Sequence, residues 1–297
     1  MDIGMQTGGL SDAVGMETAL KMIAEAGFQT VDFNIDGDHA LTAEGRDIFL
    51  QSEAEALEHF RPLKDLIKSH GLRVQQLHGP IPTYTTDSYE QERIITTIKR
   101  CIAVAGFLDC PYIIIHPAHL GFDVDMSRQE TLEANKKLFD RIFEDLERHQ
   151  VEACLENMFR GWNGKIMASA CAHPHEALEY VSILNEMAGA RRVSYCFDTG
   201  HNILQGLDVY QSILDLAPIL TTLHIHDNNG VDDQHRMPGT GVIDWSRFTR
   251  GLREINYEGV LSFETFAEFR VHPQEVFPEV IQLQAAIGRN FVREIIG

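Results

Sequence analysis

The chain has 297 residues, of which 44% are hydrophobic and 23% charged, which is ordinary for a globular protein large enough for one sizeable α/β domain. Its formal net charge of -19, with no run dense in Lys or Arg, argues against a nucleic-acid partner, because such a chain repels phosphate groups. No uninterrupted apolar run approaches the roughly 20 residues of a membrane helix, so we expect no membrane partner.

The cysteines and the N-terminus predict a cytoplasmic protein. There are five cysteines, an odd number, and none stands in a Cys-x-x-Cys pair. We therefore expect them to be reduced and mostly buried, as in cytosolic proteins. The opening residues MDIGMQTGGL lack both the basic start and the apolar core of a secretory signal.

Eight short β-type runs alternate with segments of helical period along the chain. The predicted strands are Ile3–Thr7, Thr30–Ile35, Arg73–Leu77, Tyr112–Ile115, Val151–Leu155, Val193–Phe197, Thr222–Ile225 and Gly259–Phe263. The predicted helices are Gly15–Ala26, Glu53–His70, Glu90–Ala105, Arg128–His149, Pro174–Ala188, Leu207–Leu216, Trp245–Ile255 and one within Gln274–Ile296.

Eight β–α units in a chain of this length predict a (β/α)8 TIM barrel. The alternative is an open doubly wound sheet, which usually carries a glycine-rich dinucleotide fingerprint after its first strand. Gln6-Thr7-Gly8-Gly9 is not that fingerprint. No linker or low-complexity segment interrupts the pattern, so we predict a single domain over residues 1–297.

Acids and histidines gather where the predicted strands end. In TIM barrels the catalytic groups lie at the C-terminal ends of the strands. Here those positions hold His78, His116, Glu156, Asp198, His201, His224, His226, Asp227 and Glu264. An unpaired charge at a buried strand end is costly, so these side chains are better suited to a metal or a polar ligand than to a core.

The types of side chain at these strand ends indicate which metal ion the site would suit. Two glutamates, one aspartate and one histidine form an oxygen-rich ligand set that suits one Mn²⁺, Mg²⁺ or Co²⁺ ion. The additional histidines would favour zinc, or a second metal ion.

The loop after the seventh predicted strand contains further candidates. Pro238 to Trp245 reads as a turn that introduces a helix capped by Asp244. Asp233, His235 and Arg236 have no such structural role, and we predict that they contact substrate or metal.

These motifs resemble the xylose isomerase-like TIM-barrel superfamily, which includes sugar isomerases and epimerases, inosose dehydratase-like enzymes and endonuclease IV. The motifs are Leu77-His78-Gly79, Ile115-His116-Pro117, Leu155-Glu156-Asn157, Phe197-Asp198-Thr199-Gly200-His201, His224-Ile225-His226-Asp227-Asn228 and Phe263-Glu264. Taken in order they cover nearly the whole chain.

The resemblance implies a site with defined roles. In epimerase-like members, one divalent ion is held at the positions of Glu156, Asp198, His224 and Glu264, and both glutamates exchange protons with substrate carbon. The position of His201 contacts substrate in those enzymes. Ketose 3-epimerases usually place an arginine where this chain has Gly230, and Arg236 is the nearest residue that would substitute for it.

Endonuclease IV-like members imply a rival function, a multi-zinc phosphoesterase. Their three zinc ions use nine positions, which here are His78, His116, Glu156, Asp198, His201, His224, Asp233, His235 and Glu264. The charge of -19 and the absence of a glycine–serine–histidine opening in the first strand argue against it.

We therefore predict a divalent-metal-dependent sugar isomerase or epimerase, working through an enediolate with Glu156 and Glu264 as proton shuttle. The predicted substrate-binding residues are His78, His116, His201, Asp233, His235 and Arg236, and Gln6 is a further candidate for hydroxyl contact. A lyase of the inosose dehydratase type would use the same residues.

The sequence does not determine the oligomeric state. The late aromatic residues Phe263, Phe266, Phe269 and Phe277 suit either a homodimer or homotetramer contact or ordinary packing of helices on the barrel.

Overall fold

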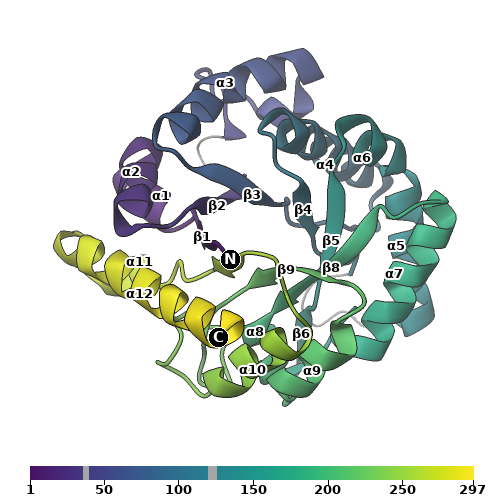
Figure 1. Cartoon of the computed structure of the whole chain (residues 1–297). Helices are drawn as coiled ribbons and strands as arrows, with labels where there is room; N and C mark the ends of the chain where they lie inside the picture. The colour runs from purple at the N-terminus through teal and green to yellow at the C-terminus, as the bar shows by residue number, and fades with distance from the viewer. Residues whose placement is uncertain (36–39, 120–125) are drawn as a thin grey trace. The chain divides into compact units, whose positions relative to one another are not determined.

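A computed structural model of the chain confirms the predicted (β/α)8 TIM barrel. It describes residues 1–35, 40–119 and 126–297. Eight parallel strands form one sheet in the order β10-β1-β2-β3-β4-β5-β8-β9 (Figure 1). Their bounds are β1 Ile3–Gln6, β2 Thr30–Asn34, β3 Arg73–His78, β4 Tyr112–Ile115, β5 Glu152–Glu156, β8 Val193–Asp198, β9 Leu220–His224 and β10 Leu261–Phe263.

The chain divides into two compact units, and each is described by itself. Unit 1 comprises residues 1–33, 66–75 and 196–297, and unit 2 comprises residues 34–65 and 76–195. The single domain predicted for residues 1–297 stays a prediction. The helices are α1 Leu10–Val14, α2 Met16–Ala26, η2 Ile48–Leu50, α3 Glu53–Ser69, α4 Ser88–Phe107, α5 Arg128–Asp140, α6 Phe143–His149, α7 Pro174–Ala188, α8 Thr199–Leu204, α9 Val209–Leu216, α10 Trp245–Glu254, α11 Glu268–Val271, η3 Gln274–Val276 and α12 Phe277–Ile296.

In unit 1, β1 lies between β2 and β10 and pairs with both in parallel register. The C-terminal helix α12 packs against α2 and α10, and α10 packs against α9 (Figure 1). The helix approaches the strands closely because residue 288 is glycine. A Cβ atom there would lie 3.0 Å from Ile3 Cγ2 and 3.1 Å from Phe263 Cε2.

The late aromatic residues belong mainly to the core of unit 1. Phe263, Phe269 and Phe277 are buried, and the rings of Phe269 and Phe277 meet edge to face at 5.1 Å. Phe266 stacks on His235 with ring centroids 4.1 Å apart. Packing within the chain therefore accounts for these residues, and the homodimer or homotetramer stays a prediction without their support.

Unit 2 contains β4 and β5, which pair in parallel with Tyr112 opposite Glu152 and Ile115 opposite Leu155. Helix α4 packs against α6 and η2, and α5 packs against α7. This register aligns the C-terminal ends of β4 and β5, so His116 and Glu156 emerge side by side.

One predicted helix is divided in the structure. The prediction of an unbroken helix over Arg128–His149 is wrong, because α5 ends at Asp140 and α6 begins at Phe143. The amides of Arg141 and Ile142 bond to carbonyls three residues earlier rather than four, so the backbone tightens at this point.

The segment after β5, where no strand or helix is predicted, forms an antiparallel hairpin of β6 Phe159–Trp162 and β7 Lys165–Ala168. The two connecting residues, Asn163 and Gly164, have φ of 51° and 71°. Positive φ at both positions of a two-residue Asn-Gly turn is the geometry that closes a tight hairpin.

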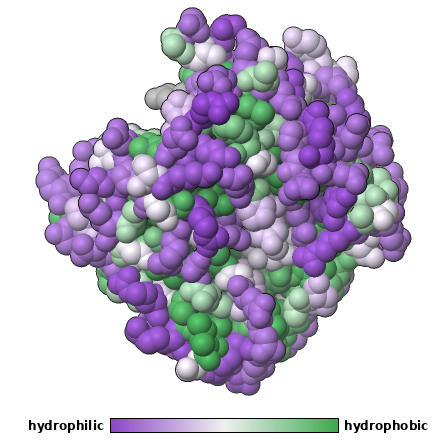
Figure 2. Space-filling view, turned by 45° about the horizontal axis from the view of Figure 1, so that its top comes forward, coloured by the Kyte–Doolittle hydropathy of each residue, from purple (hydrophilic) through white to green (hydrophobic). Residues whose placement is uncertain are grey.

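The surface and the cysteines agree with the composition. The face drawn in Figure 2 carries mainly hydrophilic residues, with smaller apolar groups between them. Among the described residues, none of the helices combines the length and apolar character needed to cross a membrane. All five cysteines lie in described residues, are buried and form no disulfide, as predicted.

Candidate active site

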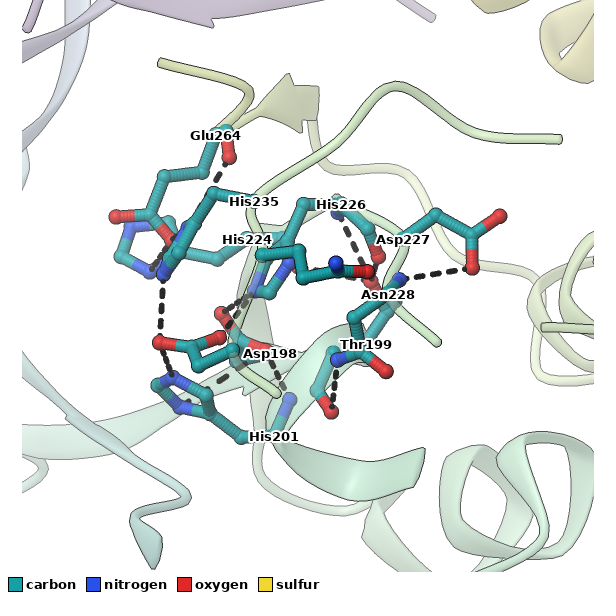
Figure 3. A network of polar contacts seen from close by, with 12 residues as sticks. Asp198, Thr199, His201, His224, His226, Asp227, Asn228, His235 and Glu264 are labelled. Atoms are coloured by element: carbon teal, nitrogen blue, oxygen red, sulfur yellow. Dashed lines mark hydrogen bonds and ion pairs between the residues drawn. The ribbon is translucent and has the colours of Figure 1, made fainter. Parts of the chain in front are cut away.

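The end of β8 places a carboxylate at the start of a helix. Asp198 is the last residue of β8 and the N-cap of α8, where its Oδ1 accepts the backbone N–H of His201 at 2.6 Å. The side chain of Asp198 is fully buried. The Asp-Thr-Gly-His order thus serves two purposes, because it begins the helix and turns the His201 ring toward the site (Figure 3).

Thr199 and Gly200 connect this helix start to the end of β9. The Thr199 hydroxyl donates to the carbonyl of His226 at 2.7 Å and accepts the His226 amide at 3.0 Å. Gly200 lies against the ring of His226, since a Cβ at residue 200 would stand 1.9 Å from His226 Cε1. This packing lets His226 Nε2 reach Asp198 Oδ2 at 2.9 Å.

The next two strands contribute His224 and Glu264. His224 ends β9, Glu264 follows β10, and both are buried. His224 Nδ1 lies 3.4 Å from Glu264 Oε2, and its Nε2 lies 3.0 Å from Asp32 Oδ2. The other oxygen of Glu264, Oε1, accepts a hydrogen bond of 2.6 Å from the Gln6 side chain.

A second group of possible ligands in unit 1 consists of His201, His226, Asp233 and His235, whose donor atoms lie within 4.8 Å of one another. Asp233 Oδ2 lies 2.9 Å from His235 Nε2 and 3.6 Å from His201 Nε2. The rings of His226 and His235 stack with centroids 3.9 Å apart.

The electrostatics of this group favour neutral imidazole beside an ionised acid. Burial, followed by the neighbouring His226, lowers the pKa of His235. Burial opposes the ionisation of Asp233, but hydrogen bonds from His201 and His235 hold its pKa well below the usual range. Asp233 is therefore ionised at neutral pH and offers its oxygens as ligand atoms.

The donor set of unit 1 fits a cation. His224 directs Nε2 at the carboxylate of Asp32, which can only accept a hydrogen bond, so Nε2 carries the hydrogen. In its neutral form the His224 ring then points the lone pair of Nδ1 toward Glu264 Oε2, at 3.4 Å. These electron-rich atoms repel one another unless a positive charge lies between them, and a divalent ion would supply that charge.

Unit 2 contributes His78, His116 and Glu156, whose donor atoms also lie within 4.8 Å of one another. His116 Nε2 lies 2.8 Å from Glu156 Oε2, and the rings of His78 and His116 meet edge to face at 5.1 Å. His78 Nδ1 lies 3.1 Å from the carbonyl of Gly79, which makes Nδ1 the protonated nitrogen of the neutral ring and leaves the lone pair on Nε2.

The loop after β9 is organised by Asp227, which the sequence placed in the ring of candidate residues. Its fully buried carboxylate accepts hydrogen bonds from the amides of Asn228, Gly239, Gly241 and Ile243 and from Trp245 Nε1. The backbones of Asp227 and Arg236 also exchange two hydrogen bonds, of 2.8 and 3.0 Å. Asp227 therefore has a structural role and holds the loop that presents Asp233 and His235.

Arg236, a predicted substrate contact, is engaged by a neighbouring acid. Its Nε lies 2.6 Å from Oε1 of Glu268, a fully buried residue. The second oxygen of Glu268 lies 3.0 Å from His272 Nε2. Substrate binding by Arg236 stays a prediction.

The predicted residues thus fall into two groups, one in each unit. Unit 1 brings together Asp198, His201, His224, Asp233, His235 and Glu264, with Arg236 on the same loop, and unit 2 brings together His78, His116 and Glu156. The predicted four-residue metal set takes Glu156 from unit 2 and its other three members from unit 1, and it stays a prediction.

Sequence reasoning missed the supporting role of three residues. It overlooked Asp32, offered Gln6 only as a hydroxyl contact, and gave His226 no partner. One signal was available, because Asp32 is an acid between Val31 and Phe33 in a strand, and a charge in such a place needs a partner.

Comparison with known proteins identifies relatives over nearly the whole chain. The family model described as xylose isomerase-like TIM barrel matches residues 20–286. The uncharacterized protein MJ1311 of Methanocaldococcus jannaschii is 26% identical over 257 residues, which cover 84% of this chain and 78% of that protein. A ketose 3-epimerase of Arthrobacter globiformis is 32% identical over 99 residues, which cover 33% of this chain and 31% of that protein.

A solved structure supports the same fold. The crystal structure of a D-tagatose 3-epimerase-like protein superposes with a TM-score of 0.73 and 21% identity, over 98% of this chain and 100% of that one. At this level of identity the similarity concerns the fold.

Proposed function

This chain belongs to the xylose isomerase-like TIM-barrel family, and from that premise we propose that it is a divalent-metal-dependent isomerase or epimerase of sugars or sugar-like polyols. The observation that carries the proposal is the buried set Asp198, His224 and Glu264. These residues lie at the ends of β8, β9 and β10. The lone pair of His224 Nδ1 faces the carboxylate of Glu264, and a bound cation would stabilise that arrangement. The partial match to a ketose 3-epimerase supports a sugar as the substrate.

We propose that Glu156 completes the ligand set. Like Asp198, it is the buried last residue of its strand, and the C-terminal ends of barrel strands face the same way. Three carboxylates and one imidazole form an oxygen-rich set that suits Mn²⁺, Mg²⁺ or Co²⁺. When bound, such an ion polarises a substrate carbonyl and acidifies the adjacent C–H bond.

The residues of the chain then move the proton. One of Glu156 and Glu264 removes the proton from substrate carbon, and the other returns it to the opposite face or to the neighbouring carbon of the enediolate. Gln6 fixes the orientation of Glu264, and His116 lies beside Glu156. The contacts proposed for substrate hydroxyl groups are His78, His116, His201, Asp233 and His235.

The test uses glutamine variants of the two glutamates. Glu156→Gln and Glu264→Gln each remove a base while keeping the shape of the side chain, so we expect losses of about 10²-fold or more in turnover on ketoses or inososes. Incorporation of solvent deuterium into substrate should fall with turnover. Glu152→Gln is the matched control, because Glu152 lies at the opposite end of β5 and pairs with Arg191. Activity that survives in both variants while they retain metal would contradict the proton shuttle.

A multi-zinc phosphoesterase is the second candidate function. The four-donor group of His201, His226, Asp233 and His235 favours it, because it offers a place for a further ion. Metal content per chain separates the two, measured on protein purified without added metal or chelator. One Mn, Mg or Co ion supports the isomerase, whereas two or three zinc ions would direct the assays to small phosphate esters.

A further inference from the structure

Asp32 is a buried acid that no motif of the site includes. It lies within β2, its side chain has no exposed area, and its Oδ2 lies 3.0 Å from Nε2 of the equally buried His224. Removing a carboxylate from water is costly unless a partner compensates it, so this contact needs a reason.

The contact selects the tautomer of His224. A carboxylate only accepts hydrogen bonds, so Nε2 of His224 carries the hydrogen and the neutral ring keeps its lone pair on Nδ1. Nδ1 is the nitrogen that faces Glu264 Oε2, at 3.4 Å (Figure 3). A metal ion binds the nitrogen that bears the lone pair, so the opposite tautomer, with its hydrogen on Nδ1, could not bind an ion on the Glu264 side of the ring.

The support extends to Glu264 through the neighbouring strand. Gln6 on β1 and Asp32 on β2 are register partners in the parallel pair. Gln6 donates a hydrogen bond of 2.6 Å to Glu264 Oε1. Two paired positions on β1 and β2 therefore contact Glu264 and His224, respectively. Strands β1 and β2 thus each supply one side chain that contacts a proposed metal ligand.

We propose that Asp32 is a positioning residue that fixes His224 with the hydrogen on Nε2, and that it thereby sets the affinity of the site for a divalent cation. This inference rests on the metal site of the proposed function. Asp32 acts through His224 and does not itself contact the ion or the substrate.

The experiment compares Asp32→Asn with the unchanged chain in two measurements. Asparagine keeps the shape but can either accept from Nε2 or donate to it, so the ring is no longer restricted to one tautomer. Long-range ¹H–¹⁵N spectra of metal-free protein, recorded well above the ordinary imidazole pKa of about 6.5, report which nitrogen carries the hydrogen. We expect the hydrogen on Nε2 in the unchanged chain and a mixture in the variant.

The second measurement is the affinity for Mn²⁺ by calorimetry, which we expect to fall about 10- to 100-fold in Asp32→Asn. Thr30→Val is the matched control, because Thr30 is a buried polar residue on the same strand and bonds to the Ile3 carbonyl rather than to His224. We expect this control to bind Mn²⁺ as the unchanged chain does.

The outcomes separate this inference from the proposed function. A hydrogen on Nδ1 of His224 in the unchanged chain would overturn the inference, as would Mn²⁺ affinity in Asp32→Asn within about threefold of it. Absence of any divalent-ion binding by the unchanged chain would refute the proposed function and the affinity half of the inference. The spectrum would then decide alone whether Asp32 positions the ring.

Discussion

Replacing Asp227 by asparagine should destabilise the protein, because one carboxylate serves as acceptor for five N–H groups. An asparagine in its better orientation still turns its amide NH₂ toward the two donors of Oδ1, the amides of Asn228 and Ile243. Each buried donor left without an acceptor costs about 1–3 kcal/mol. For the two donors together we therefore expect a loss of about 2–6 kcal/mol in the free energy of unfolding.

Urea denaturation followed by circular dichroism measures this loss, and hydrogen exchange at the amides of Asn228 and Ile243 localises it. Asp244→Asn is the control, because Asp244 caps α10 and asparagine caps helices about as well as aspartate, which predicts a change within about 0.5 kcal/mol. If Asp227→Asn also stays within about 0.5 kcal/mol of the unchanged chain, the carboxylate does not organise the loop as the hydrogen bonds indicate.

Two further predictions follow from local geometry. Gly200→Ala should cost about 1–3 kcal/mol, because the added Cβ would stand 1.9 Å from His226 Cε1, and a thermal melt that matches the unchanged chain would contradict this. Burial, and then Arg148, lowers the pKa of His149 from 6.5, so its folded environment favours the neutral ring and its contribution to stability is present above that pH. We expect the NMR titration of the His149 ring to have its midpoint below pH 6.5. As the pH falls below 6.5, the free energy of unfolding should decline, and it should decline less in His149→Gln. A midpoint at or above 6.5 would contradict the lowered pKa.

The chemistry-bearing residues could be predicted because they occupy strand ends, which periodicity locates to within a residue or two. Asp198, His224 and Glu264 were found in this way. The supporting role of Asp32 could not be predicted in this way. Its contact with His224 joins β2 and β9, which are not neighbours in the sheet order, and depends on a side-chain direction that the sequence does not specify.

Other omissions had visible signals. Asn163-Gly164 is the dipeptide typical of a two-residue hairpin turn, and the predicted strands nevertheless do not include the segment around it. Asp227 was grouped with the candidate ligands because it follows His226, whereas its bonds go to amides up to 18 residues further along the chain. The sequence shows that Asp227 is an acid near a strand end, but the path of the backbone after it determines which N–H groups its carboxylate accepts.

The paired backbone hydrogen bonds between Asp227 and Arg236 close residues 228–235 into a segment whose two ends are fixed. Asp233 and His235 lie on that segment, which connects β9 to α10. In evolutionary terms, we expect the donor residues of this loop to be exchanged more readily than the residues at the strand ends, because the backbone pair holds the two ends of the loop. For an engineer, randomising residues 229–235 while retaining Asp227 and Arg236 would vary the donors and keep the two residues that pair at the ends of the segment.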